Sequence, residues 1–357
     1  MIMKVVFDGS DLIRFDGSKS ILYIMIGLPG SGKSHISNRI KDYYGDSVAN
    51  VLSSDNYRLK LFGDENDQTH NQEVFNALYK DMRTLLLNKG VVIFDATNCT
   101  IKDRQRVFNQ ISNKDIRENT IVVAYLVNTP YHVCVDRDSN RNRVVGKEVI
   151  KKFLHKFQCP QYFEGFDRIM FNYLGEDLNM SEVESFIVNN FMKDFDQMNP
   201  HHIKTLDRHC MDIAKHYDKE DDFRYIAGML HDVGKLDTQT FDEQGIAHYY
   251  SHDSVGAYKM CCFNEYIRKD HLLETIMFIN YHMNFHKDWR SDKYKKLFGD
   301  SLYNMLVEFA NYDMIESGTE EIHNDIIRMQ KEEKLVLKDI LNSSIYKEHK
   351  ERKLSLS

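Results

Sequence analysis

The sequence predicts a parallel α/β domain followed by an all-α domain, and three observations lead to this fold class. Strand-like apolar runs alternate with amphipathic helical segments as far as about residue 175. Beyond residue 180 the strand signals stop and helical patterns follow one another. Histidine is also uneven, since 12 of the 16 histidines lie in residues 201–357. Strands that alternate with helices form a parallel sheet with helices on both faces, so the two halves are expected to differ in class.

Four strands are predicted in the first half, each a short apolar run. They cover residues 20–26, 51–53, 91–94 and 121–127. Helices are predicted over residues 35–44, 71–89 and 100–111. In the second of these helices, apolar residues recur at the spacing of one helical face.

The second half is predicted to be helical throughout. The expected helices cover residues 181–193, 201–217, 222–231, 252–266, 271–283, 301–315 and 320–341. A short acidic stretch at 175–177 and the break at Asn199–Pro200 place the domain boundary between them. The expected organisation is a first domain over 1–178, a linker over 179–198, a second domain over 199–342 and a basic tail over 343–357.

Composition excludes several classes of protein. The apolar runs are far shorter than the ~20 residues of a membrane span, and the N-terminus has no signal-peptide pattern. None of the six cysteines forms a C-x-x-C pair, which argues against a zinc knuckle or a disulfide framework and favours the cytoplasm. The net charge of −7 provides no global attraction for nucleic acid, so such binding requires a local basic patch.

Residues 27–34 (GLPGSGKS) match the phosphate-loop pattern G-x-x-x-x-G-K-[ST], with a predicted strand before them and a helix after them. In such a loop Lys33 places a positive charge on the transferred phosphoryl group, and Ser34 offers its hydroxyl to Mg²⁺. Backbone N–H groups curl around the β- and γ-phosphates. The sequence therefore predicts an ATP and Mg²⁺ site, with the backbone contacts supplied by Gly30, Ser31 and Gly32.

Three further residues lie where ligands collect in such folds, at the carboxyl ends of the predicted strands. Asp55 could take the proton from an attacking hydroxyl, and Arg58, one helical turn later, could bind an acceptor phosphate. Taken alone, Asp55 as a helix N-cap beside a surface arginine is the better explanation of this pair. Asp95 ends the third strand and could orient the Mg²⁺ shell or bond to neighbouring loops.

Residues 137–156 hold seven lysines or arginines and two acids, a local excess of five positive charges. Two of them, Arg137 and Arg141, are four apart and would reach one phosphate from a single helix, as a lid over the transition state. Arg143 follows closely. The alternative is a solvated helix face, which accounts for most runs of charge.

Four segments carry a resemblance: the phosphate loop, S-D-x-x-R at 54–58, D-A-T-N at 95–98 and R-x-x-x-R at 137–141. In this order and at these intervals, they resemble the 5′-OH polynucleotide kinases of phages and bacterial RNA-repair systems over residues 21–175. The resemblance implies that Lys33 and Ser34 bind ATP and Mg²⁺ and that the two lid arginines clamp the ATP phosphates. It also implies that Asp55 is the general base and that Arg58 contacts a phosphate of the acceptor strand. Small-molecule phosphate-loop kinases share parts of this set.

In the second half, His231, Asp232 and Lys235 form the pattern H-D-x-G-K after an apolar helical stretch. Further candidate ligands lie about one helix plus a turn apart, so that five helices could direct them at a common centre. Mixed histidine and aspartate ligands suit Mn²⁺, Fe²⁺, Co²⁺, Ni²⁺ or Zn²⁺, and Mg²⁺ if waters complete its shell. Lys235 could hold a substrate phosphate. The predicted ligands are His209, His231, Asp232, His252, His282 and Asp313.

Residues 200–315 resemble the HD-domain phosphohydrolases, whose pattern is H…HD…D with two further histidines in two-metal members. The resemblance implies one or two divalent metals and hydrolysis of phosphate esters. Two assignments stay open: His248 could replace His252, and His202 could support a ligand or contact substrate. His216, His271 and His286 are expected to be structural.

The two halves together resemble fused end-healing enzymes. The expected function is transfer of the ATP γ-phosphate to a 5′-OH end of RNA or DNA and removal of a 2′-, 3′- or 2′,3′-cyclic phosphate at the opposite end. A ligase would act downstream, and no membrane is involved. The alternative is a nucleoside or nucleotide kinase fused to an HD nucleotidase, which would act on free nucleosides in a closed pocket. A non-catalytic ATP-switched binding protein is opposed by the intact Lys33, Ser34, His231 and Asp232.

Overall fold

The computed structural model describes residues 12–141, 143–174, 180–199, 202, 204–220, 222–285 and 291–317. The chain divides into two compact units between Tyr173 and Leu174, and each unit is described separately. The predicted helix 320–341 and the predicted tail 343–357 lie outside the described residues.

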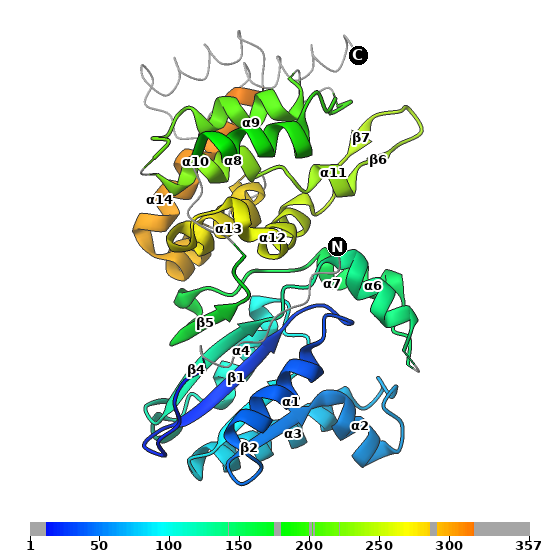
Figure 1. Cartoon of the computed structure of the whole chain (residues 1–357), viewed down its shortest axis with the longest axis vertical. Helices are drawn as coiled ribbons and strands as arrows, with labels where there is room; N and C mark the ends of the chain where they lie inside the picture. The colour runs from blue at the N-terminus through cyan, green and yellow to red at the C-terminus, as the bar shows by residue number, and fades with distance from the viewer. Residues whose placement is uncertain are drawn as a thin grey trace. The chain divides into compact units, whose positions relative to one another are not determined.

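The first unit is built on a five-stranded parallel sheet with the strand order β2-β3-β1-β4-β5. Figure 1 labels β1, β2, β4 and β5 of this sheet. This order confirms the predicted fold class. The four predicted strands are present with slightly shifted ends, and β5 was not predicted. The fifth strand gave no signal because it is a four-residue edge strand with only one buried side chain. The strands are β1 (Ser20–Ile26), β2 (Ala49–Ser53), β3 (Val91–Asp95), β4 (Thr120–Leu126) and β5 (Arg168–Phe171).

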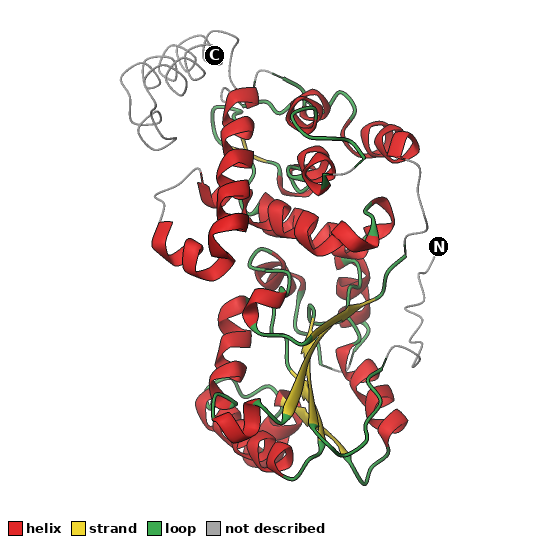
Figure 2. Cartoon of the chain, turned by 90° about the vertical axis from the view of Figure 1, so that its left-hand side faces the viewer, coloured by secondary structure: helices red, strands yellow, loops and turns green. Residues whose placement is uncertain are grey.

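Helices cover both faces of this sheet, as Figure 2 shows. The predicted helices at 35–44, 71–89 and 100–111 correspond to α1, α3 and α4. No range was predicted for α2, α5, α6 or α7, although helical turns were expected at residues 55–58 and 137–141. The helices are α1 (Lys33–Tyr44), α2 (Ser54–Phe62), α3 (Asn71–Leu87), α4 (Ile101–Gln110), α5 (Lys114–Arg117), α6 (Tyr131–Ser139) and α7 (Lys147–Leu154).

The core of the first unit lies around β1, the central strand, in which all seven residues are buried. β1 pairs in parallel with β3 on one side and β4 on the other, so the carboxyl ends of these strands lie at one edge of the sheet. This edge carries the phosphate loop after β1, Asp55 at the start of α2 and Asp95 at the end of β3. Strand pairing therefore brings together three segments that are distant in the sequence.

The second unit is mainly helical, and its helices carry the histidine-rich sequence (Figure 1). The expectation that no strand follows residue 180 was wrong in one place: β6 (Thr240–Phe241) pairs antiparallel with β7 (Ala247–His248). Such two-residue strands are too short for a periodic pattern. A π-helical turn over Val188–Met192 follows α8. The helices are α8 (Met180–Ile187), α9 (Leu206–Ala214), α10 (Phe223–Leu230), α11 (Lys235–Thr238), α12 (His252–Cys262), α13 (Leu272–Tyr281) and α14 (Ser291–Ser317).

The predicted helix 201–217 is shorter in the structure, because α9 begins only at Leu206. The predicted helix 301–315 lies within the longer α14, which has non-helical backbone angles at Gly299. Among the described residues, no helix combines the length and the apolar character that a membrane crossing requires.

Candidate functional site

The phosphate loop connects β1 to α1 and is shaped by its glycines. Gly30 and Gly32 have φ angles of 81° and 98°, which disfavour other residues. A Cβ atom on Gly30 would also lie 2.2 Å from the carbonyl oxygen of Cys134 in α6. The Thr129 hydroxyl and Arg137 Nη1 donate to the carbonyl of Ser31 at 2.8 and 3.2 Å. Residues 129–137, which precede the proposed lid arginine Arg141, therefore pack against the phosphate loop and fix its shape.

Lys33 is buried at the start of α1, and its ammonium donates to the carbonyl oxygens of Gly27 and Leu28 at 2.9 Å. Burial lowers the pKa of Lys33, while the charge of Asp95 opposes that shift. Asp95 is also buried at the end of β3, and burial raises its pKa against the charge of Lys33 and a hydrogen bond from Ser34.

One oxygen of Asp95, Oδ2, is buried and has no hydrogen-bond partner among the described residues. A carboxylate oxygen left without a partner beside a serine hydroxyl suits a hard cation such as Mg²⁺. Ser34 and Asp95 thus fit the metal expected with ATP.

Two guanidinium groups contact the same carboxylate oxygen of Asp55. Nη1 of Arg58 lies 2.8 Å from Oδ1, and Nη1 of Arg143 lies 2.9 Å from the same atom. Arg58 is buried and also donates to Oδ1 of Asn71 at 2.8 Å. The N-cap explanation of Asp55 is wrong, because Ser53 is the N-cap of α2 and Arg58 is not a surface residue.

The lid arginines do not lie on one helix, which corrects the expectation. Arg137 belongs to α6, but the helix ends at Ser139, and Arg141 lies beyond it with an exposed side chain. Arg137 contacts the phosphate loop, as described above. Arg141 is near enough for its charge to act on the pKa values of Lys33 and Asp95.

Sequence reasoning missed Arg104, a fully buried residue of α4. Its guanidinium binds both carboxylate oxygens of Glu164 at 2.7 and 2.8 Å. It also donates to the carbonyls of Asn98 and Gln158 at 3.0 Å, and so supports the loop that follows Asp95. No local signal could identify Arg104, because Glu164 is 60 residues away.

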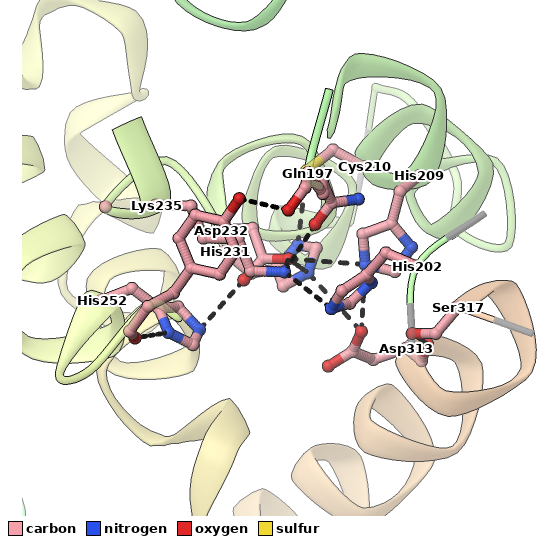
Figure 3. Close-up of polar contacts among 12 residues, drawn as sticks. Gln197, His202, His209, Cys210, His231, Asp232, Lys235, His252, Asp313 and Ser317 are labelled. Carbon is pink, nitrogen blue, oxygen red and sulfur yellow. Dashed lines mark hydrogen bonds and ion pairs between the residues drawn. The ribbon is translucent and has the colours of Figure 1, made fainter. Parts of the chain in front are cut away.

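The second unit brings the six predicted metal ligands together from five helices and the residues that directly follow them. All of them except His282 are labelled in Figure 3. His209 lies in α9, His231 and Asp232 directly follow α10, and His252 begins α12. His282 directly follows α13, and Asp313 lies in α14. All six residues are buried.

Asp232 lies at the centre of this cluster and faces two pairs of histidines. Its Oδ2 lies 3.2 Å from Nε2 of His231 and 3.5 Å from Nε2 of His209. Its Oδ1 lies 3.0 Å from Nε2 of His252 and 3.6 Å from Nε2 of His282. Oδ1 of Asp313 lies 3.1 Å from Nε2 of His209. The carboxylate of Asp232 is therefore shared by two groups of ligand atoms.

Hydrogen bonds to backbone carbonyls indicate the tautomer of three of the histidines. Nδ1 of His231, His252 and His282 lies 2.8, 2.7 and 2.8 Å from the backbone carbonyl three residues earlier. A carbonyl only accepts, so Nδ1 carries a proton, and in the neutral imidazole the Nε2 lone pair faces the cluster. This is the arrangement by which proteins orient metal-binding histidines.

The ring nitrogens that face the cluster are suited to bind a cation. Nε2 of His209 and Nε2 of His231 are buried and make no hydrogen bond within the described part of the chain. Nε2 of His252 and Nε2 of His282 lie 3.2 Å apart, and in the neutral rings both present a lone pair. Two trios could each hold a metal ion, with ligand atoms within 4.8 Å of one another: His209, His231 and Asp313, and His231, Asp232 and His282.

The pattern H-D-x-G-K has a steric reason for its glycine. A Cβ atom on Gly234 would lie 2.0 Å from the carbonyl oxygen of His252, so glycine allows the start of α12 to approach Asp232. Lys235 is buried and lies 2.6 Å from Oδ2 of Asp232. Burial alone would raise the pKa of Asp232, but the positive charge of Lys235 contributes to holding it well below its usual value.

The two open assignments have different outcomes. His248 is not near the cluster ligands: it pairs with Asp242 at 3.0 Å and stacks on Tyr250. It therefore does not replace His252. His202 does lie beside the cluster, with Nε2 3.2 Å from Nζ of Lys235 and its ring centroid 5.6 Å from that of His209. His216 pairs with Glu316, and His286 lies outside the described residues.

Comparison with known proteins gives a family for part of the first unit. Residues 22–160, less than half of the chain, match the family model AAA_33, described as an AAA domain. With the phosphate loop and the parallel sheet, this match identifies the first unit as a P-loop kinase domain. No curated protein matches the chain.

Two solved structures are similar to parts of the chain. One is titled "Structure of the Pnkp1/Rnl/Hen1 RNA repair complex": identity is 24%, the match covers 41% of this chain and 45% of that chain, and the TM-score is 0.33. The other is titled "Structure of Pnkp1/Rnl/Hen1 complex", with 25% identity, coverage of 33% and 39%, and a TM-score of 0.29. Thus this chain spans less than half of either matched chain, and likenesses this weak support no functional conclusion.

Proposed function

We propose that the first unit transfers the γ-phosphate of ATP to the 5′-OH end of RNA or DNA. We further propose that the second unit removes a terminal 2′-, 3′- or 2′,3′-cyclic phosphate from a nucleic-acid end. The observation that carries the kinase proposal is the pair of guanidinium groups on Asp55, at the same sheet edge as the phosphate loop. Together the two activities would prepare broken ends for a ligase.

The acceptor site suits an alcohol that carries a phosphate nearby. Arg58 and Arg143 both bind Oδ1 of Asp55, so its other oxygen can accept the proton of an attacking hydroxyl. Two guanidinium groups on one carboxylate leave one positive charge in excess. An acceptor phosphodiester compensates that charge, whereas a free nucleoside does not, which favours a polynucleotide.

In the proposed transfer, the 5′-hydroxyl loses its proton to Asp55 and its oxygen forms the new bond to the γ-phosphorus. The bond between that phosphorus and the β–γ bridging oxygen breaks, and ADP leaves. Lys33 and Arg137, which both contact the phosphate loop, stabilise the charge that develops during transfer. Ser34 and Asp95 would hold Mg²⁺.

A basic surface on α7 also favours a polymeric acceptor. Lys147, Lys151 and Lys152 in this helix and Lys156 just after it are exposed, and none forms an ion pair within the described residues. The single acid of the helix is Glu148. These four lysines, here called the α7 cations, continue along the chain from Arg143, which contacts Asp55. They are suited to the phosphates that follow the reacting end.

The proposal for the second unit rests on the buried donor set. His209, His231, Asp232 and Asp313 would hold one divalent cation, and Asp232, His252 and His282 would contribute to a second, among Mn²⁺, Co²⁺, Ni²⁺ and Zn²⁺. Such cations supply Lewis acidity toward a phosphate and lower the pKa of water. The chain's own part is to direct Nε2 lone pairs inward and to place Lys235 beside Asp232.

The kinase proposal is tested by following the label from γ-labelled ATP. The acceptors are 5′-OH RNA, 5′-OH DNA, nucleoside 3′-monophosphates and free nucleosides. Label on the polynucleotides is expected. Label confined to free nucleosides would instead favour the small-molecule kinase, and absence of label from every polynucleotide would overturn the proposal.

The hydrolase proposal is tested with 3′-phosphate, 2′-phosphate and 2′,3′-cyclic phosphate ends, each with Mn²⁺ and with a chelator. Metal-dependent loss of at least one of these end groups is expected. Action on mononucleotides alone would favour a nucleotidase. No metal-dependent loss of any of them would refute the proposal.

A further inference from the structure

A half-buried imidazole beside the cluster has an N–H group for which the described part of the chain offers no acceptor. This imidazole belongs to His202, in the segment before α9. Its Nε2 lies 3.2 Å from Nζ of Lys235. An ammonium group only donates, so Nε2 of His202 accepts this hydrogen bond and the ring proton lies on Nδ1.

Nδ1 of His202 is buried and has no hydrogen-bond partner among the described residues. Its surroundings explain why it differs from His231, His252 and His282, whose Nδ1 atoms each bond the carbonyl three residues earlier. For His202 that carbonyl belongs to Asn199, and it accepts the backbone N–H of His202 at 3.0 Å. The carbonyl that binds the other three Nδ1 atoms in this way is therefore already occupied at His202.

Lys235 is less suited than the Nδ1–H of His202 to donate a hydrogen bond to a bound phosphate. Its ammonium has three hydrogen atoms and lies within reach of three acceptors: Oδ2 of Asp232 at 2.6 Å, Oε1 of Gln197 at 2.8 Å and Nε2 of His202. Binding a phosphate directly would require one of these contacts to break. Lys235 is better suited to fixing the tautomer of His202 and neutralising Asp232.

We propose that the Nδ1–H of His202 donates a hydrogen bond to an oxygen of the phosphate that binds at the metal centre. The ring of His202 lies edge to face against that of His209, one of the proposed ligands, with centroids 5.6 Å apart. A buried donor without a partner is costly, and an anionic oxygen is the strongest acceptor that can satisfy it. This inference rests on the proposed phosphohydrolase and names a residue that recognises its substrate.

The test uses two substitutions that each keep one nitrogen's function. In His202→Asn the side-chain amide can occupy the place of Nδ1, whereas in His202→Gln it can reach the place of Nε2. The probe is inorganic phosphate, titrated calorimetrically into the full chain loaded with Mn²⁺. We expect His202→Gln to weaken phosphate binding about tenfold and His202→Asn to weaken it less than about threefold.

Mn²⁺ affinity and 5′-kinase activity, measured on the same samples, show whether each variant is folded and loaded. His271→Gln is the matched control, because His271 lies beside the exposed Asp270 and not in the cluster. It should leave phosphate affinity unchanged.

Other outcomes overturn the inference. If His202→Asn is the impaired variant, His202 acts only by holding Lys235. Equal effects of the two substitutions, or no phosphate binding by the Mn²⁺-loaded wild type, also refute the contact. The expected pattern without hydrolysis of any nucleic-acid end would leave the contact standing and refute the proposed hydrolase. Hydrolysis with equal effects of both substitutions would do the reverse.

Discussion

At the scale of single residues, each candidate site contains a central aspartate. The charge of the groups around that aspartate differs between the two sites. Asp55 lies against two guanidinium groups, and Asp232 lies among four imidazoles and an ammonium. The first arrangement has excess positive charge and suits an anionic acceptor. The second has lone pairs directed inward and suits a cation. The same residue type thus serves opposite ligands because its neighbours differ.

Arg143 is expected to determine the choice of acceptor. In Arg143→Gln the acceptor site keeps Arg58 but loses the excess charge, so the KM for a 5′-OH oligonucleotide should rise about tenfold or more. The KM for ATP should change little, since Arg143 contacts Asp55 and not the phosphate loop. Steady-state kinetics with both substrates measures this difference.

Arg83→Gln serves as the control, because Arg83 bonds Gln110 at the far ends of α3 and α4. It should alter neither KM. If Arg143→Gln lowered only the affinity for ATP, the placement of Arg143 at the acceptor would be wrong.

At the scale of elements, helix ends decide where the functional groups lie. α6 ends at Ser139, and the carboxylate of Asp138 accepts the backbone N–H groups of Val145 and Gly146 at 3.1 and 2.8 Å. The chain therefore turns back before α7, which leaves Arg141 exposed and brings Arg143 to Asp55. A continuous helix would place both elsewhere.

The α7 cations are predicted to bind the acceptor strand beyond its first phosphate. The double variant Lys147→Glu/Lys151→Glu should raise the KM for a 12-nucleotide acceptor several-fold, about tenfold at low salt, and the effect should shrink as salt rises. The KM for a nucleoside 3′-monophosphate should stay unchanged. Kinetics at two ionic strengths with both acceptors measures the contrast.

Lys102→Glu/Lys114→Glu has the same change of charge on another part of the first unit and is the matched control. An equal effect of this control would mean that net charge, not the surface of α7, governs binding.

A carboxylate network joins α9 to the end of α14. Lys204 pairs with Asp212 at 2.8 Å and with Glu316 at 2.7 Å, and His216 pairs with Glu316 at 2.9 Å. Burial alone would raise the pKa of Glu316, but Lys204 and His216 lower it below its ordinary 4.5. A carboxyl whose pKa is lower in the folded state stabilises that state above its unfolded pKa, and this contribution is lost as the pH falls.

We therefore expect Glu316→Gln to lower the free energy of unfolding at pH 7 and to approach the wild type as the pH falls below about 4.5. Urea denaturation of both proteins at pH 7 and at acid pH measures the difference. Glu243→Gln, at an exposed position of the β6–β7 loop, should show no such dependence. A deficit that stayed constant with pH would contradict the assignment.

At the scale of the whole molecule, the chain consists of two compact units, each with its own buried core and its own candidate site. The phosphate loop, Asp55 and Asp95 belong to the first unit. The six candidate metal ligands belong to the second. Loss of one site should therefore leave the other active.

Two substitutions test this separation. Lys33→Ala should abolish 5′ phosphorylation and spare release of terminal phosphate, whereas Asp232→Ala should do the reverse. Label transfer from ATP and phosphate release from an end-phosphorylated strand are measured on the same preparations. If either substitution removed both activities while the protein remained folded, the assignment of two independent sites would be wrong.

Prediction from sequence succeeded where the signal is local. The phosphate loop, the strands around β1 and the pattern H-D-x-G-K are each recognised within a few residues, because backbone geometry or steric fit demands them there. It failed for β5, the β6–β7 hairpin, the end of α6 and the buried Arg104. These depend on partners far along the chain, or are too short to show a period.

By itself, the sequence determined which chemical groups the protein possesses and the order of the elements that carry them. The tertiary structure decided which of these groups meet, and in what protonation state. It placed Arg143 on Asp55, paired His248 with Asp242 away from the candidate metal ligands and brought His202 to Lys235. The physical reason is that hydrogen-bond partners and burial set the charge and tautomer of a side chain, and both come from residues distant in the sequence.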